Sequence, residues 1–183
     1  MAEGMRGAKR PVTAVLAGPY GHPFHPMLVT VPIGAWVVSL LFDVASRLVG
    51  HPGFLAAGSE WLIGIGVLGA AAAAATGFLD LAVIPPGTWV FRTACTHMTI
   101  NLVLIFVYAG SFLWRHRTFT PGAPVSPAMV MLSAACVAAL LASGYLGGKL
   151  TYRYGVRVAA ESIQVEGYLP AGDDDQSRRA PRG

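Results

Sequence analysis

The sequence predicts an all-α fold: an integral membrane four-helix bundle in up-down-up-down order with short polar termini. Of the 183 residues, 54% are hydrophobic and only 12% are charged, a composition too apolar for an ordinary soluble domain. Four stretches reach the length of about 20 residues that a helix needs to cross the hydrocarbon core of a bilayer. Turn-forming residues separate these stretches. We therefore expect four membrane helices and a lipid bilayer as the main partner.

The first helix is expected at about residues 26–49. It follows the motif Gly-His-Pro-Phe-His-Pro, in which a proline directly follows each of His22 and His25. Proline disfavours helical geometry in the residue before it and suits the first position of a helix, so both histidines should be extended and His25 should be the N-cap. The positive helix end favours a neutral imidazole there, the form that ligates metals. Asp43 and Arg47, four residues apart near the far end, predict a structural ion pair.

The second helix is expected at about residues 58–84, where Pro-Pro-Gly stops it. Glycine and alanine dominate its sequence, and small residues let helices approach closely in lipid. We therefore predict that this helix is the central and best buried member of the bundle. The residues expected at helix contacts are Gly66, Gly69, Ala73 and Gly77.

The third and fourth helices are expected at about residues 91–114 and 126–148. After Arg92 at its start, the third contains no acid or base except His97. An ionisable residue inside a span faces the protein interior by default and indicates a functional site. Cys95 and Cys136 lie in these two helices without CxxC spacing, so they predict packing rather than a disulfide or a zinc site.

An uneven distribution of Lys and Arg predicts the orientation. Four spans place both termini on one side of the membrane, together with ten of the thirteen Lys and Arg residues. This excess predicts cytoplasmic termini, with residues 1–20 as an N-terminal segment, 21–160 as the transmembrane domain and 161–183 as a partly disordered tail. The apolar stretch 12–17 is too short for a signal peptide. Nucleic acid is not an expected partner, because no basic domain with interleaved aromatic residues is present.

The up-down order of the four spans brings several polar residues to the cytoplasmic end of the bundle. His25 and His97 come from opposing helices, and Asp80 should match the depth of His97 and orient it. Asn101 lies one turn from His97 on the same helix face. The glycines near the end of the fourth helix leave room for a flat group, and basic residues just outside would meet its carboxylates. The predicted cofactor-binding residues are His22, His25, Asp80, Arg92, His97, Asn101 and Lys149, with His25 and His97 as the metal ligands.

Several of these residues form patterns that resemble a known family, the bacterial four-helix membrane domain of unknown function 2231. The resemblance covers about residues 20–160 and implies the same four-helix fold in a bacterial inner membrane. Some relatives are joined to Rieske iron-sulfur domains, which implies proximity to electron transfer by association, and the family supplies no catalytic residues. The matching residues are Gly21-His22-Pro23-x-His25-Pro26, Leu28-Val29, Pro32, Asp43, Gly77, Asp80, His97, Asn101 and Gly147-Gly148-x-Leu150-x-Tyr152-x-x-Gly155-Val156-x-Val158.

The sequence is consistent with two classes of function. In the first, the protein is a redox-associated module in which the two histidines ligate haem b or a transition metal, next to a redox or respiratory partner protein. In the second, it is a structural or assembly subunit, or a small transporter, without a cofactor. Because the sequence shows no nucleophile with a neighbouring base, hydrolytic catalysis is disfavoured, and whether the protein is an enzyme stays open.

Overall fold

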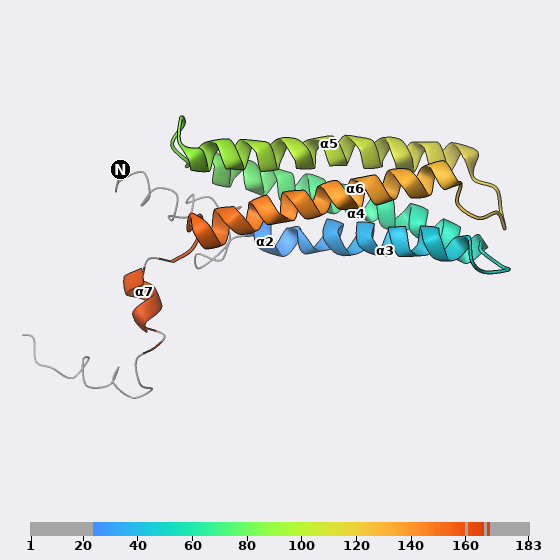
Figure 1. Cartoon of the computed structure of the whole chain (residues 1–183), viewed down its shortest axis with the longest axis horizontal. Helices are drawn as coiled ribbons and strands as arrows, with labels where there is room; N and C mark the ends of the chain where they lie inside the picture. Colours follow the sequence, from blue (N-terminus) through green and yellow to red (C-terminus); the bar gives the residue numbers. More distant parts are fainter. Residues whose placement is uncertain (1–23, 160, 167, 169–183) are drawn as a thin grey trace, which may run out of the picture.

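Four long helical rods lie side by side, and each runs opposite to the one before it in the chain (Figure 1). The computed structural model describes residues 24–159, 161–166 and 168. All regular structure within these residues is helical. Four segments are long and apolar enough to cross a membrane, which confirms the predicted all-α membrane fold: Phe24–Ser46, Gly53–Ala82, Trp89–Thr118 and Pro127–Arg153.

The first rod consists of two helices, α2 (Phe24–Leu28) and α3 (Thr30–Ser46). The break between them follows from Pro32, which lacks the N–H that would bond to the carbonyl of Leu28 and whose ring crowds that carbonyl. The first span therefore begins two residues earlier than predicted and is interrupted within its first two turns.

The second and third rods are single helices, α4 (Gly53–Ala82) and α5 (Trp89–Thr118). Helix α4 begins directly after Pro52 rather than at residue 58, because proline tolerates the start of a helix and the glycines that follow do not break it. Thr88 caps α5 by accepting a hydrogen bond from the backbone N–H of Phe91.

The fourth rod is α6 (Pro127–Gly148), which continues into the π-helical turn η3 (Lys149–Arg153). The hydroxyl of Ser126 caps its start. After η3 the chain turns back, with positive φ angles at Gly155 and Arg157. The short helix α7 (Glu161–Glu166) stands apart from the four rods (Figure 1).

Buried positions recur at alternating spacings of three and four residues on the long helices. This is the heptad pattern of side chains that interlock in left-handed four-helix bundles. On α4 the buried residues are Ser59, Ile63, Gly66, Ala70, Ala73 and Gly77. On α5 the inward-facing series is His97, Asn101, Leu104, Tyr108, Ser111 and Arg115.

The centre of the core is a stack of two aromatic rings. Trp36 of α3 and Tyr108 of α5 lie with ring centroids 4.1 Å apart and nearly parallel, and both are almost fully buried. Ile63, Leu104 and Leu140 complete this cluster from three helices. The other tryptophans are exposed, as expected for residues at membrane interfaces.

Helix α4 has one buried stripe and is less buried than the first and fourth spans, so the prediction that it is the best buried member is wrong. Its small residues do form close helix contacts: a Cβ on Gly69 would lie 2.6 Å from Val31. However, Trp61, Leu68 and Phe78 on its other faces are largely exposed. The reason is the arrangement of the bundle, a ring in which α4 packs mainly against the first rod and α5.

The packing of Gly66 against Trp36 gives the first prediction. The indole N–H of Trp36 donates to the carbonyl of Ile63 at 3.4 Å, and a Cβ on Gly66 would overlap that nitrogen. Gly66→Ala should therefore lower the free energy of unfolding by about 1–3 kcal/mol, the usual effect of overpacking. Thermal unfolding in detergent measures this effect.

Gly110→Ala is the matched control, because a Cβ at that exposed helical position meets nothing within 4 Å. This variant should keep the wild-type unfolding midpoint or exceed it, since alanine has the higher helix propensity. Equal midpoints for Gly66→Ala and Gly110→Ala would show that the Trp36 contact does not limit the packing of α4.

Candidate functional site

Two buried polar regions lie at opposite ends of the bundle. The histidine cavity contains His25 and His97 and lies at the end where the first rod begins and α6 finishes. The ion-pair cluster consists of Asp43, Ser59, Ser111, Arg115 and Ser133 and lies toward the other end. The stack of Trp36 on Tyr108 lies between them, since Tyr108 follows His97 and precedes Arg115 along α5.

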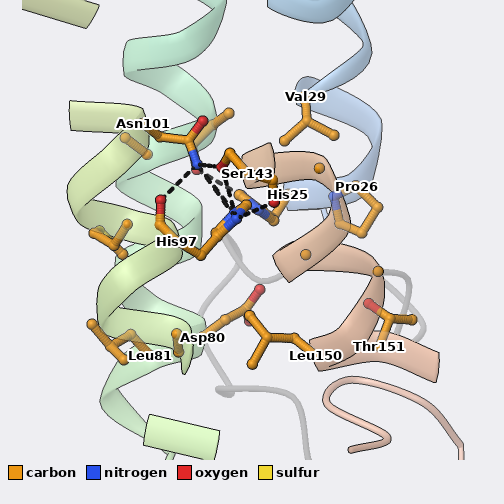
Figure 2. Close-up of a pocket in the computed structure, with 18 of the residues that line it drawn as sticks. His25, Pro26, Val29, Asp80, Leu81, His97, Asn101, Ser143, Leu150 and Thr151 are labelled. Carbon is orange, nitrogen blue, oxygen red and sulfur yellow. Dashed lines mark hydrogen bonds between the residues drawn. The ribbon is translucent and has the colours of Figure 1, made fainter. Parts of the chain in front are cut away.

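The histidine cavity has a volume of about 310 Å³ and is lined by all four rods and the segment after η3. Most of its wall is apolar. Four ionisable side chains line it, each from a different element: His25, Asp80, His97 and Arg157. Figure 2 shows the two imidazoles next to each other, with Asn101 to one side and Asp80 to the other.

The side chain of His25, on α2, contacts the backbone of α4. Its Nδ1 lies 2.8 Å from the carbonyl oxygen of Ala73, and a Cβ on Gly77 would lie 2.9 Å from the ring. His25 is therefore inside a helix with its side chain in the core, and the predictions of an extended residue and an N-cap are wrong. The helix begins two residues earlier than predicted because Pro26 fits anywhere in its first turn.

His97 makes the equivalent contact from α5 to α6. Its Nδ1 lies 2.9 Å from the carbonyl oxygen of Ser143, and Gly147 leaves room for the ring. A carbonyl oxygen only accepts hydrogen bonds, so Nδ1 carries a proton in both histidines, and in a neutral ring Nε2 would keep the lone pair that binds a metal. The ring centroids are 6.5 Å apart and the ring planes are nearly perpendicular.

Asn101 supports His97 as the sequence predicted. Its amide nitrogen lies 3.3 Å from Nε2 of His97 and 2.6 Å from the hydroxyl oxygen of Ser143. The amide also donates to the backbone oxygen of His97 at 2.8 Å. Asn101 thus ties the imidazole to the helix turn that carries it and to α6.

Asp80 does not orient His97, contrary to the prediction. Its carboxylate oxygen Oδ1 lies 3.0 Å from Nε of Arg157, and among the described contacts it makes none with His97. The side chain of Arg157 is only 7% exposed. Asp80 still lines the same cavity, so its depth was predicted correctly and its partner was not.

The basic residues predicted for the site lie elsewhere. Arg92 is exposed and sits over the ring of Trp89, and Lys149 lies 5.7 Å from the ring of Tyr154. Neither lines the cavity. His22 falls outside the described residues.

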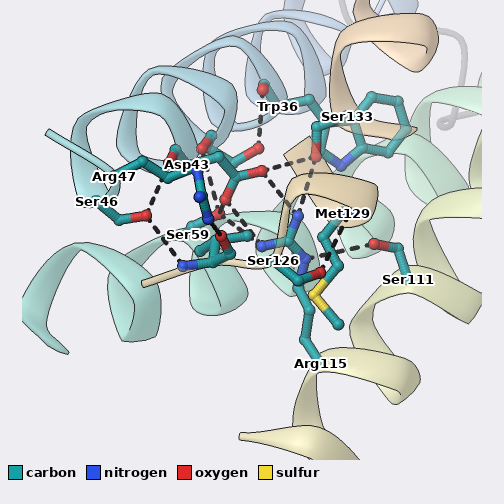
Figure 3. Close-up of polar contacts among 12 residues, drawn as sticks. Trp36, Asp43, Ser46, Arg47, Ser59, Ser111, Arg115, Ser126, Met129 and Ser133 are labelled. Atoms are coloured by element: carbon teal, nitrogen blue, oxygen red, sulfur yellow. Dashed lines mark hydrogen bonds and ion pairs between the residues drawn. The ribbon is translucent and has the colours of Figure 1, made fainter. Parts of the chain in front are cut away.

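The ion-pair cluster joins the four long helices (Figure 3). Asp43 of α3 is fully buried, and both of its carboxylate oxygens accept hydrogen bonds from Arg115 of α5, at 2.8 and 2.7 Å. The hydroxyl groups of Ser59 on α4 and Ser133 on α6 also donate to this carboxylate. Each long helix thus contributes at least one member, and α5 contributes both Ser111 and Arg115.

This arrangement corrects the predicted pair between Asp43 and Arg47. Arg47 instead donates to the backbone oxygen of Val125, in the loop before α6. Arg115 takes its place because it continues the inward-facing series of Tyr108 and Ser111 on α5, with spacings of three and four residues. That spacing was the signal in the sequence that would have placed Arg115 in the core.

Removing the charge of Asp43 gives the second prediction. Asp43→Asn leaves a buried guanidinium without a counter-charge, which should cost about 3–5 kcal/mol of stability. We expect a large drop in the unfolding midpoint in detergent. Replacing both partners, as in Asp43→Asn with Arg115→Met, should restore part of the loss.

Glu60→Gln is the matched control for this prediction. Glu60 pairs with His116, whose side chain is 72% exposed, so its loss should change stability by about 1 kcal/mol or less. If Asp43→Asn unfolded at the same temperature as Glu60→Gln, the ion-pair cluster would not hold the bundle together.

The spans and their buried polar regions define a multi-pass helical membrane protein. Comparison with known families identifies it further: the chain belongs to the DUF2231 family, described as predicted membrane proteins, with the match covering residues 21–160. This finding confirms the resemblance seen in the sequence. No curated protein and no solved structure matches the chain.

Proposed function

We propose that this protein is a haem-binding membrane module that takes part in electron transfer, in which His25 and His97 would hold the iron. One observation carries the proposal. Two imidazoles from opposite sides of one cavity anchor Nδ1 on a backbone carbonyl, with ring centroids 6.5 Å apart. A histidine that ligates a metal typically donates its other ring N–H to such an acceptor, which fixes the tautomer and the ring orientation.

The separation of the rings supports a shared iron. With a metal–nitrogen bond of about 2 Å on each side, and each ring centre about 1 Å beyond its nitrogen, two axial imidazoles have centroids about 6 Å apart. The observed separation of 6.5 Å is close to that value. Ligation through Nε2 of His97 would also require the Asn101 amide to move away from that nitrogen.

The number of ligands favours haem over a metal ion held by side chains alone. Within residues 24–159, no group of three or more His, Cys, Asp or Glu side chains is placed to hold a metal ion. Structural and catalytic zinc sites need three or four protein ligands. Haem iron receives four nitrogen ligands from the macrocycle, so two histidines complete its coordination.

The walls of the cavity also suit a large apolar group. The volume of about 310 Å³ lies at the lower end of the range for ligand pockets, about 300–1,000 Å³. Gly144, Gly147 and Gly148 form one wall without side chains. When bound, haem would supply one-electron exchange, and the chain would hold the iron, set the ring orientation and exclude water.

The location of the cavity supports a role at one membrane face. It lies at the end of the bundle where the first span begins and the last span ends, and the sequence outside the spans on that side holds ten of the thirteen Lys and Arg residues. This excess supports cytoplasmic termini in a bacterial inner membrane. A redox partner protein would then exchange electrons from the cytoplasmic side. The alternative of a structural subunit or small transporter without a cofactor gives no reason for two adjacent imidazoles with the same anchored tautomer.

Expression with haem supplied gives the third prediction. Purified wild-type protein should show a Soret band, and a titration should give one haem per chain. His25→Ala and His97→Ala should each weaken or shift the band, because each removes one axial ligand. Absorption spectra of the purified proteins, normalised to protein concentration, measure this.

His51→Ala and His116→Ala are the matched controls, since both histidines are exposed and lie at the other end of the bundle. These variants should keep the wild-type spectrum. If wild-type protein acquired no haem, or if the control variants lost haem as fully as the cavity variants, the proposed function would be wrong.

A further inference from the structure

We infer that Arg157 is the anion-binding residue of the histidine cavity and that the bound ligand carries a carboxylate. This inference rests on the proposed function and adds to it the charge of the ligand and the residue that recognises that charge. Arg157 is the one arginine among the residues that line the cavity, and the sequence placed it in the segment after the last membrane helix.

A tight turn brings Arg157 back over the bundle. The N–H of Val156 donates to the carbonyl of Leu150 at 3.0 Å, and the N–H of Gly155 donates to the carbonyl of Thr151 at 3.0 Å. The side chain of Val156 is buried in a small apolar cluster with Ile84 and Ala94. These contacts fix the backbone on both sides of the turn.

The backbone of Arg157 itself has a φ of 61°, in the left-handed region. That conformation is strained for a residue other than glycine, and it persists only where the surrounding contacts hold it. The charged side chain of Arg157 lines the cavity and is only 7% exposed.

Asp80 forms an ion pair with Arg157. Its Oδ1 lies 3.0 Å from Nε of Arg157, so the two opposite charges lie side by side at the cavity wall. The planar guanidinium group matches the two oxygens of a carboxylate. Asp80 therefore orients the arginine as well as neutralising it, and this is the role we assign to Asp80 in place of orienting His97.

The depth of the ion pair agrees with a ligand that is apolar in its centre and acidic at one edge. Asp80 follows Gly77, the residue beside His25, by three positions on α4, which is about 4.5 Å along the helix axis. The ion pair thus lies about one turn nearer the bundle end than the imidazoles. Haem has this polarity, because its two carboxylates extend from the same edge of the macrocycle.

A purely structural role for the pair, fastening the turn at residues 154–158 to α4, makes a different prediction. A structural pair would matter equally for every ligand of the cavity. An anion-binding arginine matters only for ligands that carry the acid. The dimethyl ester of haem keeps the macrocycle but has no free carboxylate, so comparing the two compounds in wild type and variants separates the two roles.

The experiment titrates wild-type protein and three variants with haem and with haem dimethyl ester, and compares the ratio of the two affinities. In wild type, haem should bind about ten- to a hundredfold more tightly than the ester, the contribution of a charge-assisted hydrogen bond. Arg157→Gln should reduce this ratio to near one while leaving the affinity for the ester unchanged. Arg157→Lys should keep part of the preference, since it keeps the charge without the planar geometry.

Arg153→Gln is the matched control, because Arg153 is exposed on η3 and does not line the cavity. It should keep the wild-type ratio. An equal affinity of wild type for haem and ester would overturn the role of Arg157 and leave the two-histidine site intact. The same holds if Arg157→Gln lost both ligands alike, since the pair would then be structural. If wild type bound neither compound, the proposed function would fail as well.

Discussion

The ion pair between Asp43 and Arg115 is the constraint on which the rest of the bundle depends. Two charges inside a membrane domain must be paired, because an isolated charge there costs several kcal/mol. Asp43 satisfies this requirement only when α3, α4, α5 and α6 all present their polar residues at one level. A slip of any helix by one turn would break the cluster, so it fixes the register of the four helices.

Because one end of the bundle is fixed in this way, the other end is able to contain open space. The aromatic stack of Trp36 and Tyr108 closes the core between the two regions. Beyond it, glycine and alanine replace large side chains, and the imidazoles of His25 and His97 occupy the space they leave. The ion-pair cluster and the proposed binding site therefore lie at opposite ends of the same helices.

The sequence was sufficient for the membrane fold and for part of the site. Apolar length defined the four spans, and an even number of spans brought His25 and His97 to one end. The helix rotations were harder to predict, because they depend on which residues share a face over many turns. Counting the series from His97 to Arg115 in steps of three and four would have placed Arg115 in the core.

Counting residues along a helix could not have predicted the position of Arg157 or its ion pair with Asp80. They depend on a turn after the last membrane helix, with positive φ at Gly155 and Arg157, that returns the chain to the bundle. The pattern of Gly155 followed by the buried Val156 was the only local sign of this turn. Proximity of charged residues along the sequence likewise suggested Arg47 as the partner of Asp43, whereas packing between helices selected Arg115.

Electron paramagnetic resonance of the ferric haem complex measures most directly whether His25 and His97 share one iron. Two axial imidazoles make the iron six-coordinate and low-spin, so wild-type protein should show a low-spin signal. His25→Ala and His97→Ala should each give a high-spin signal from iron with one remaining axial ligand. A high-spin signal in wild type, or a low-spin signal that survives both substitutions, would contradict ligation by these two histidines.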